Sequence, residues 1–308
     1  MKLHHLREVV AIAEKGSIRG ASRALNVAQP ALTRSVAELE RELGAPLFER
    51  RARGAVATPI GQAFIQRATT ILQEIRCAQE EVDQLRGLST GTVTAGLSIA
   101  AHLSLLSVAL KPFRAKYRQV TLRLIEGYYS TLETGLRNGS VDFYVGPDPG
   151  EGIAPGLEKE ILSGNRRTVI SRVGHPLAAA TSLHQLVDAD WASMPTSGDS
   201  DREMIATFRQ HGLPPPRVVV RSQSALTLMT CLTSSDLLAI APLQWVKSRL
   251  TRDFLTAVAI KEDLVAPAVV AIKRTDIPLT PAATWLLDLM RRAAVAGRAH
   301  ASCRDYAR

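Results

Sequence analysis

The side chains with the clearest chemical use stand close together in the sequence, at Gln29, Pro30, Thr33 and Arg34. Glutamine can form two hydrogen bonds to adenine and arginine two to guanine, whereas threonine can contact the methyl group of thymine. A helix that begins near Gln29 would carry these side chains on its solvent side and keep Leu32 and Val36 inside. The spacing therefore predicts that the first turns of one helix read base edges in a groove of DNA.

A second polar group follows at Arg50, Arg51 and Arg53, just before Gly54. Guanidinium groups in a turn can bind phosphate or enter a minor groove, and Ser17 with nearby backbone amides could add phosphate contacts. Such contacts determine register and affinity, whereas base contacts determine which sequence is read. A run of three arginines is also common in a solvated loop, so the run alone leaves both interpretations open.

Sequence motifs of enzymes are missing from this chain. No HExxH, GxSxG, P-loop or strand-linked GxGxxG pattern occurs, and the glycine-rich residues 146–152 contain two prolines and are predicted as a loop. Cys77, Cys231 and Cys303 are too far apart in sequence for a disulfide framework or a zinc site, so we expect reduced thiols, with Cys231 buried as an apolar residue. We expect no catalytic residue, cofactor or metal. A hydrolase whose serine, histidine and aspartate meet only in space is one alternative.

Three short helices are predicted in the first part of the chain. The apolar side of the first helix is formed by Leu3, Leu6, Val9, Val10 and Ala13. The second helix runs from the N-cap Ser17 to Leu25, and the third starts at Gln29 and stops at Gly44. The buried side of the third helix is expected at Leu32, Val36, Leu39 and Leu43. Residues 47–57 are predicted as two short extended pieces around the basic turn, which completes the parts of a winged helix-turn-helix.

Thr58-Pro59 predicts the start of a long helix, because a capping threonine precedes a proline at the first helical position. Apolar residues then continue at alternating steps of four and three up to Gly87, the heptad seam of a coiled coil. The seam consists of Phe64, Ala68, Ile71, Ile75, Ala78, Val82 and Leu85. At roughly 1.5 Å per residue the helix is about 40 Å long. We expect it to form a dimer through residues without an evident partner in their own chain, Phe64, Ile71, Ile75, Val82 and Leu85. A surface helix packed on its own chain is the alternative.

From Gly91 onward, short β-rich runs alternate with helical ones, which is the pattern of an α/β fold. Strands are predicted at residues 92–97, 120–126, 142–146, 218–221, 237–241 and 269–272. Helices are predicted to start at capping boxes headed by Ser130, Ser182 and Ser200, and the last one at Thr280-Pro281. The end of the chain, from Arg291 to Arg308, is basic and poorly patterned and is predicted as a frayed tail, with a nucleic-acid arm as the alternative.

The composition is that of an ordinary soluble protein with two or three domains. Of 308 residues, 46% are hydrophobic and 22% are charged, which excludes disordered and collagen-like classes. The net charge of +9 favours an anionic partner, and residues 1–60 hold ten Lys and Arg against six Glu. No apolar run of about 18 residues and no signal peptide is present, so we expect a cytoplasmic protein with no membrane partner.

Six stretches of the sequence together form a recognisable signature, at residues 16–33, 39–40, 43–44, 47–50, 58–61 and 174–177. They resemble the LysR-type transcriptional regulators. The likeness is close over the first 65 residues and extends, in length and order of elements, over nearly the whole chain. Ser22, Thr33 and Ala57 depart from the residues usual in that family, alanine, serine and leucine. Each change is conservative in size or polarity, so it bears on base preference and not on the fold.

The resemblance implies an α+β multidomain protein. Residues 1–60 would form the winged helix-turn-helix DNA-binding domain, 61–88 the linker and dimerisation helix, 89–300 an effector-binding domain like the periplasmic solute-binding proteins, and 301–308 a tail. Within the effector domain, lobe I would hold residues 89–163 and 268–300, and lobe II residues 164–267. The protein would bind double-stranded promoter DNA as a dimer of dimers and respond to a small molecule held between the lobes.

In such a domain the ligand cleft is lined by strand ends and helix N-termini, whose amides attract anions. The resemblance suggests effector contacts at four such junctions, formed by Ser98, Tyr129, Ser130, Ser197, Ser200, Gln223 and Ser224. Each hydroxyl could instead serve only to cap its own helix. Tyr128, Tyr129 and the serine-rich candidates suit a small organic or aromatic acid as effector. A DNA-architectural protein whose α/β body only oligomerises is the second alternative.

Overall fold

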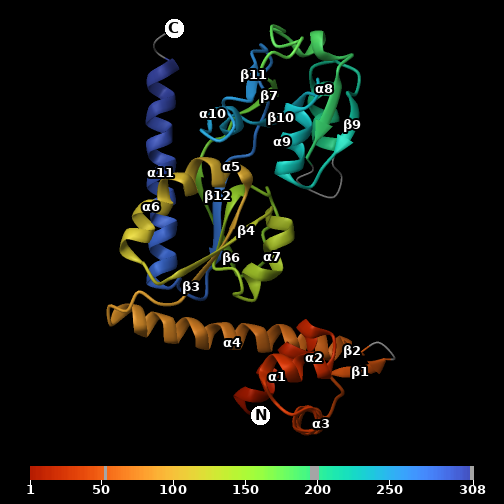
Figure 1. The fold of residues 1–308 in the computed structure, drawn as a ribbon, viewed down its shortest axis with the longest axis vertical. Helices are drawn as coiled ribbons and strands as arrows, with labels where there is room; N and C mark the ends of the chain where they lie inside the picture. The colour runs from red at the N-terminus through yellow and green to blue at the C-terminus, as the bar shows by residue number, and fades with distance from the viewer. Residues whose placement is uncertain (52–53, 195–200, 306–308) are drawn as a thin grey trace. The chain divides into compact units, whose positions relative to one another are not determined.

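The computed structural model describes residues 1–51, 54–194 and 201–305, shown as a ribbon in Figure 1. Three residues of the expected sites, Arg53, Ser197 and Ser200, lie outside these ranges. The chain divides into two compact units, one of residues 1–88 with 134–141 and the other of residues 89–133 with 142–308.

The first unit begins with the three predicted helices, α1 (Leu3–Lys15), α2 (Ile18–Leu25) and α3 (Gln29–Leu43). The Ser17 side chain accepts a hydrogen bond from the Gly20 amide at 3.1 Å, so the predicted N-cap of α2 is confirmed. Leu32, Val36 and Leu39 are buried on α3 as expected, whereas Leu43 is 40% exposed because it lies in the last turn.

The buried side of α1 differs from the predicted one. It is formed by His5, Leu6, Glu8, Val9, Ala11 and Ile12, while Leu3 is 37% exposed and Ala13 is exposed. The reason is that α1 packs against α2, α3 and α4 together, so it buries a wider side than a single apolar stripe. Polar residues complete that side. The Ser35 hydroxyl donates a hydrogen bond to the buried Glu8 carboxylate.

The wing is the antiparallel pair β1 (Phe48–Arg51) and β2 (Gly54–Ala57). It is fixed to the turn before α2, where the Ala55 amide donates to the Gly16 carbonyl at 3.0 Å. A Cβ atom on Gly54 would lie 2.2 Å from that carbonyl oxygen, so only glycine allows this approach. Glu40 of α3 holds the start of the wing, because its Oε1 accepts from the Leu47 and Phe48 amides at 2.7 and 3.2 Å.

The long helix is α4 (Pro59–Leu85), capped by Thr58 as predicted. The expectation that Phe64 has no partner in its own chain is wrong. Phe64 packs on the buried cluster of Val9, Leu39 and Leu47, next to the fully buried Ala68. The rest of the seam is different, since Ile71, Val82 and Leu85 are 42%, 55% and 74% exposed and Ile75 is half-buried.

The second unit contains a five-stranded sheet in the order β4-β3-β5-β12-β6. The strands are β3 (Thr92–Leu97), β4 (Thr121–Glu126), β5 (Phe143–Pro147), β6 (Leu157–Ser163) and β12 (Val269–Arg274). β3 runs parallel to β4 and β5, and β12 antiparallel to β5 and β6. Figure 1 shows α6 (Ser107–Lys116) beside α11 (Pro281–Asp305). These helices form one core with the sheet, in which Phe113, Phe143 and Leu286 are fully buried.

The same unit contains a second group of strands, β10-β7-β11, and a parallel pair, β8-β9. They are β7 (Arg167–Arg172), β8 (Asp190–Ser193), β9 (Arg217–Arg221), β10 (Ala239–Pro242) and β11 (Leu255–Val258). A bridge between Trp191 and Leu238 links the pair to the group. The helices here are η2 (Leu183–Leu186), α8 (Arg202–Gln210), α9 (Ala225–Thr233) and α10 (Gln244–Lys247). The chain passes from the five-stranded sheet to these strands after Ser163 and returns before Val269.

A short helical segment joins the two groups of strands. It begins as α5 (Ile99–Ala101) after β3 and continues as the π-helical η1 (His102–Leu106) into α6. Ile99 and Leu103 of this segment pack against the core beneath α9 and α10, which includes Leu228 and Trp245. The helical segment therefore follows directly after a strand of the five-stranded sheet, but its side chains contact the core beneath the other group of strands.

Four strands were not predicted from the sequence, β6, β7, β8 and β11. β6 lacks the alternation of a half-buried strand, because only Leu157 and Leu162 are buried and the residues between them are exposed. It is held at the sheet edge by pairing with β12 and by ion pairs such as Glu160 with Arg291 at 2.8 Å. β7 has only three buried residues, between polar residues at both ends. These segments are strands because they pair with strands that are distant in the sequence, and not because of their own residue pattern.

Two predicted capping boxes are wrong. Helix α7 (Tyr129–Arg137) starts at Tyr129, so Ser130 lies inside its first turn and is exposed. Ser182 precedes only the short 3-10 helix η2 and makes no capping hydrogen bond; instead Gln185 Oε1 accepts from the Thr181 amide at 2.7 Å. The Thr280 cap of α11 is confirmed, with the Ala283 amide donating to its hydroxyl at 3.4 Å.

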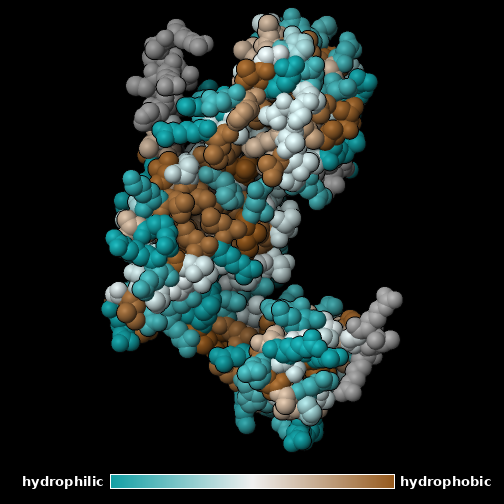
Figure 2. Space-filling view, viewed as in Figure 1, coloured by the Kyte–Doolittle hydropathy of each residue, from teal (hydrophilic) through white to brown (hydrophobic). Residues whose placement is uncertain are grey.

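Figure 2 shows hydrophobic side chains gathered on the visible side of the second unit over α5 and α6. Val108 and Leu110 of α6 are among the exposed large apolar residues.

None of the helices in the described part of the chain is long and apolar enough to span a bilayer. Within residues 1–51, 54–194 and 201–305, no three His, Cys, Asp or Glu side chains are grouped as metal ligands would be.

Candidate functional site

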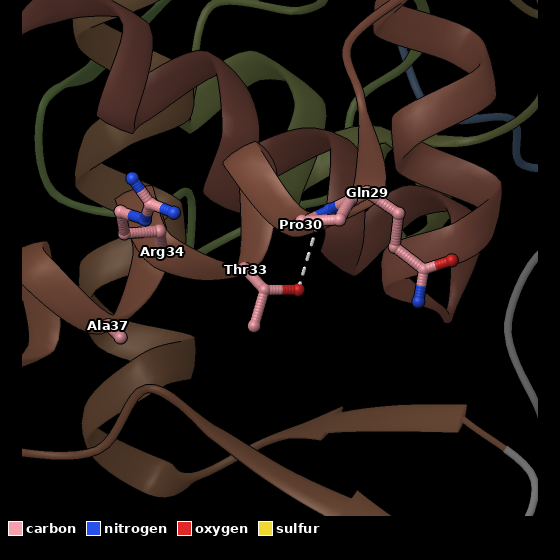
Figure 3. A pocket seen from close by; sticks show the side chains of 5 residues that line it. All are labelled: Gln29, Pro30, Thr33, Arg34 and Ala37. Carbon is pink, nitrogen blue, oxygen red and sulfur yellow. Dashed lines mark hydrogen bonds between the residues drawn. The ribbon is translucent and has the colours of Figure 1, made fainter.

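The first turns of α3 carry the polar side chains that the sequence analysis selected for base contacts. Gln29, Pro30 and Arg34 are exposed and Thr33 is half-buried, while Leu32 of the same turns is fully buried. With Ala37 they border an open groove of about 600 Å³, seen from close by in Figure 3. Gln29 and Arg34 extend in different directions on either side of Thr33 in this view. The helix therefore presents two side chains capable of paired hydrogen bonds to open space.

Thr33 has a more restricted role than its neighbours. Its hydroxyl donates a hydrogen bond to the Gln29 carbonyl at 2.9 Å, the dashed line in Figure 3. Because the hydroxyl is used by the helix backbone, the γ-methyl group is the part left for an external contact. That agrees with the chemistry expected for a residue that meets a thymine methyl group.

The wing and Ser17 lie next to each other in the first unit. The backbone of Arg50 and Arg51 belongs to β1, and β2 is bonded to Gly16, the residue before Ser17. Ser17 is half-buried and its oxygen already caps α2. Its hydroxyl could still donate to a phosphate oxygen, while the half-buried start of α2 contributes the partial positive charge of a helix N-terminus.

A second candidate site is a pocket inside the second unit. It has a volume of about 50 Å³ and lies where residues of both groups of strands meet. Its polar lining is formed by Ser98, Tyr128, Asn165 and Arg167, and its apolar lining includes Ile99, Met194, Leu228, Ile240 and Trp245. A water molecule needs about 10–15 Å³ of such space, so in this arrangement the pocket has room for a few water molecules or for a small anion such as acetate.

Ser98 is the candidate that the structure brings to this pocket. It follows β3, is buried, and its oxygen accepts a hydrogen bond from the Ala101 amide at 3.3 Å. Its backbone amide donates to the Val145 carbonyl at 2.9 Å, which fixes it between neighbouring strands. The helix-capping role is therefore present, and the hydroxyl hydrogen is left for a second partner.

The other described candidates do not line the pocket. The Tyr129 hydroxyl accepts from the Ala154 amide at 2.8 Å and Tyr129 is buried. Ser130, Gln223 and Ser224 are exposed, and Ser224 caps α9 through the Thr227 amide at 3.4 Å. The Tyr129 hydroxyl is thus engaged with a loop, and the capping interpretation describes Ser224, whereas Ser130 and Gln223 lie exposed away from the pocket lining.

The pocket contains one charged group that the sequence did not indicate, Arg167. Its guanidinium Nη1 lies 2.8 Å from Oε2 of Glu203 on α8. Tyr128, next to the selected Tyr129, is the tyrosine that faces the pocket. Burial raises the pKa of the Tyr128 hydroxyl to about 12; Arg167 acts in the opposite direction, and Glu203 and Glu126 raise it further. The hydroxyl therefore remains a hydrogen-bond donor at neutral pH.

Trp245 is a lining residue with an indole N–H that is unpartnered among the described residues. The residue is fully buried and lines the pocket, and its Nε1 has no hydrogen-bond partner among the described residues. A buried donor without an acceptor is unfavourable by roughly 1–3 kcal/mol, which an acceptor atom of a ligand would relieve.

A winged helix-turn-helix with an exposed reading helix, together with an α/β unit that has a polar pocket, defines the class of DNA-binding regulators with a ligand-sensing domain. Residues 3–62 match the model of the bacterial regulatory helix-turn-helix protein, lysR family, and residues 86–295 match the LysR substrate binding domain. The chain belongs to the LysR family of transcriptional regulators, as the sequence resemblance indicated. It is a regulator and not an enzyme, which excludes the hydrolase alternative.

Relatives and solved structures agree with this assignment. The HTH-type transcriptional regulator GbpR of Rhizobium radiobacter is 32% identical over 246 residues, which cover 78% of this chain and 80% of that protein. GbpR of Azospirillum brasilense is 29% identical over 239 residues, covering 77% and 70%. The crystal structure of CbnR, a LysR family transcriptional regulator, has a TM-score of 0.70 at 21% identity, covering 96% of this chain and 99% of that chain. Full-length CbnR complexed with its target DNA has a TM-score of 0.69 at 21% identity, covering 95% and 100%. At this identity the solved structures establish the fold.

Proposed function

We propose that this regulator reads promoter DNA with Gln29, Pro30, Thr33 and Arg34 of α3 in the major groove. Arg50, Arg51 and Arg53 of the wing, with Ser17, would contact phosphate or the minor groove. The observation that carries the proposal is the exposure of Gln29 and Arg34 on a helix whose opposite side is buried. The excess of basic residues in this part of the chain and a neighbour in structure that is bound to its target DNA support it.

Substitutions that remove a base contact or a phosphate contact test this proposal. The probe is a duplex selected from a random pool by the wild-type protein, compared with an unrelated duplex. Gln29→Ala should cost about 1–3 kcal/mol on the selected site through lost base contacts, and little on unrelated DNA. Arg51→Ala or Arg53→Ala should weaken binding to both duplexes and lower the salt slope by about one per lost phosphate contact.

Gln66→Ala is the matched control, because Gln66 is an exposed glutamine on α4 outside the proposed surface. Unchanged binding by Gln29→Ala and by both arginine variants would remove the assignment of this surface.

The assembly that we propose is a dimer of dimers, with α4 pairing across the exposed Ile71, Val82 and Leu85 and the half-buried Ile75. Phe64 contributes mainly to its own unit, as its packing shows. We also propose a cytoplasmic location, because the promoter DNA that it would bind is there.

For residues 89–300 we propose two lobes that hold a small organic anion. Lobe I comprises residues 89–163 and 268–300, lobe II residues 164–267. Arg167 would pair with the anion, Ser98 and Tyr128 would donate hydrogen bonds, and the apolar side chains around Trp245 would receive its organic part. The small volume of the pocket, about 50 Å³, means that a larger effector such as an aromatic acid requires the lobes to separate first. The two chain crossings, after Ser163 and before Val269, are the places where such a movement could occur.

A thermal-shift screen of small carboxylates and sulfonates, each beside its uncharged amide or sulfonamide, tests the ligand proposal. A ligand that binds the folded state raises the midpoint of unfolding with its concentration. We expect anions to raise it and their uncharged counterparts not to. If no anion in the panel raises the midpoint, the alternative of a DNA-architectural protein without an effector is favoured.

A further inference from the structure

The cation in the pocket already has a partner inside the protein. Among the described residues that line the pocket, Arg167 alone has a charged side chain. Its partner Glu203 does not line the pocket but reaches Arg167 from the first turn of α8, with 2.8 Å between Nη1 and Oε2. An anion that enters the pocket must therefore share this guanidinium with Glu203 or take its place.

The two partners of this ion pair differ in their exposure to water. The Arg167 side chain is 16% exposed and that of Glu203 is 52% exposed. Arginine cannot lose its proton, and a mostly buried charge without a partner is strongly unfavourable, so Arg167 needs an anion beside it. A half-exposed carboxylate regains water at little cost, and the helix dipole stabilises it at the start of α8. Glu203 is therefore the partner that can be replaced.

The pocket offers an incoming carboxylate hydrogen-bond donors in addition to Arg167. Tyr128 has a protonated hydroxyl near Arg167, Ser98 has a hydroxyl hydrogen to donate, and Trp245 has an unpartnered N–H among the described residues. A carboxylate in the pocket could accept from these donors as well as from Arg167. An uncharged ligand could use the same donors but could not replace the negative charge beside Arg167.

Resting on the proposed anion-binding function, we propose that Glu203 is a specificity-determining residue, an internal competitor for Arg167 that the carboxylate of an organic acid displaces. While Glu203 is paired, the pocket excludes anions that form a single contact with the guanidinium. A ligand succeeds when its carboxylate makes the additional hydrogen bonds and its organic part fills the apolar side of the pocket. Displacement also separates α8 from the first residue of β7, so the exchange changes the structure around the site.

The test uses the full-length protein and sodium acetate, an anion small enough for the pocket, with acetamide as its uncharged counterpart. Binding is followed by tryptophan fluorescence, since Trp245 lines the pocket, at an ionic strength kept constant with sodium fluoride. Glu203→Gln removes the competing charge while keeping the size of the side chain. It should bind acetate up to about fivefold more tightly than wild type, the range expected for loss of a partly exposed ion pair, with no gain for acetamide.

Asp236→Asn is the matched control. Asp236 pairs with Arg172 at the opposite end of β7, at 2.6 Å and with a similar exposure of 57%, so the variant removes the same charge from an equivalent pair outside the pocket. It should bind acetate as wild type does. Equal gains in both variants would mean that only the net charge matters, which contradicts the proposal.

A third variant separates failure of this inference from failure of the ligand proposal. Arg167→Met should abolish acetate binding if the anion site is real. If it does so and Glu203→Gln shows no gain, the anion site stands and the role of Glu203 is refuted. If neither wild type nor Glu203→Gln binds acetate, both proposals fail. Because Glu203 is half-exposed we expect the variant to fold, and Glu203→Ala provides a second removal of the carboxylate with the same expected gain.

Discussion

At the scale of single residues, His5 illustrates how burial determines protonation. The ring is 5% exposed at the start of α1, and its Nδ1 accepts a hydrogen bond from the Lys2 amide at 3.3 Å. That bond requires an unprotonated Nδ1. Burial lowers the pKa of His5, and the charges of His4 and of the N-terminal ammonium lower it further, while Glu8 and Glu42 act in the opposite direction. The folded protein therefore holds this histidine neutral more strongly than the unfolded chain does.

The consequence is a loss of stability on acidification. In the unfolded chain the imidazole takes up its proton near pH 6.5, whereas in the folded protein it takes up the proton only at a lower pH. The contribution of His5 to the free energy of unfolding should be fully present above about pH 6.5 and decrease as the pH falls towards the folded pKa. NMR titration of the ring checks the pKa, and unfolding of wild type and His5→Gln by denaturant between about pH 5 and pH 8 checks the linkage. A pKa of His5 at or above about 6.5 would contradict the expectation.

At the scale of elements, α4 combines two functions along its length. Its first turns complete the core of the first unit, because a Cβ atom on Gly61 would lie 2.0 Å from the Leu47 carbonyl oxygen and Phe64 packs beside it. Further along, the same heptad seam has exposed Ile71, Val82 and Leu85. Exposed apolar residues that continue a buried seam indicate a partner surface. The change from buried to exposed near Ile71 is where we expect the contact with a second subunit to begin.

Ile71→Asp should therefore dissociate the dimer that we propose, because it introduces a charge into the apolar seam. The mass measured by light scattering should fall to that of smaller species at the same protein concentration. Gln66→Asp is the control, since it adds the same charge at an exposed position of α4 off the seam and should leave the mass unchanged. An unchanged mass for Ile71→Asp would show that α4 does not form the subunit contact.

At the scale of the whole molecule, regulation requires that a ligand distinguish two arrangements of the protein, because a ligand with equal affinity for both shifts neither. The pocket is suited to this, since Ser98 comes from the five-stranded sheet and Arg167 from the other group of strands. A ligand bonded to both would favour the arrangement in which the two are close. Ile99 and Leu103, which pack against the core of the second group, would have to accommodate any movement between them.

Ser98→Ala tests this coupling. Loss of one hydrogen bond to a charged ligand is worth about 1–3 kcal/mol, so we expect roughly fivefold to over a hundredfold weaker binding of the best carboxylate from the screen. DNA affinity without ligand should not change. Since Ser98 also caps α5, Thr280→Ala serves as control, because it removes a comparable cap from α11 away from the pocket. Calorimetry and DNA footprinting give the two readouts. Unaltered ligand binding would place the site elsewhere, and loss of basal DNA binding would limit Ser98 to a role in the fold.

The sequence by itself was sufficient for the elements whose signals are local. The Ser17 and Thr58 caps, the stop at Gly44, the exposed Gln29 and Arg34 and the length of α4 all follow from contacts within a few residues, which the sequence order records directly. The family signature was readable for the same reason, since most of it lies in these elements. Four strands could not be predicted from the sequence, namely β6, β7, β8 and β11. Their conformation comes from pairing with distant strands and not from an alternation of apolar and polar residues.

The position and the lining residues of the pocket depend on the tertiary structure. Sequence position suggested four junctions with hydroxyl groups, but only Ser98 among the described candidates lines the pocket. The Tyr129 hydroxyl accepts from the Ala154 amide, and Tyr128 lines the pocket instead. Which of the two neighbouring tyrosines lies at the pocket depends on the residue at which α7 begins. Arg167 and Glu203 are 36 positions apart in the sequence and meet at 2.8 Å. A contact of that kind depends on how β7 and α8 pack together, and packing between distant segments leaves no pattern in the order of the residues.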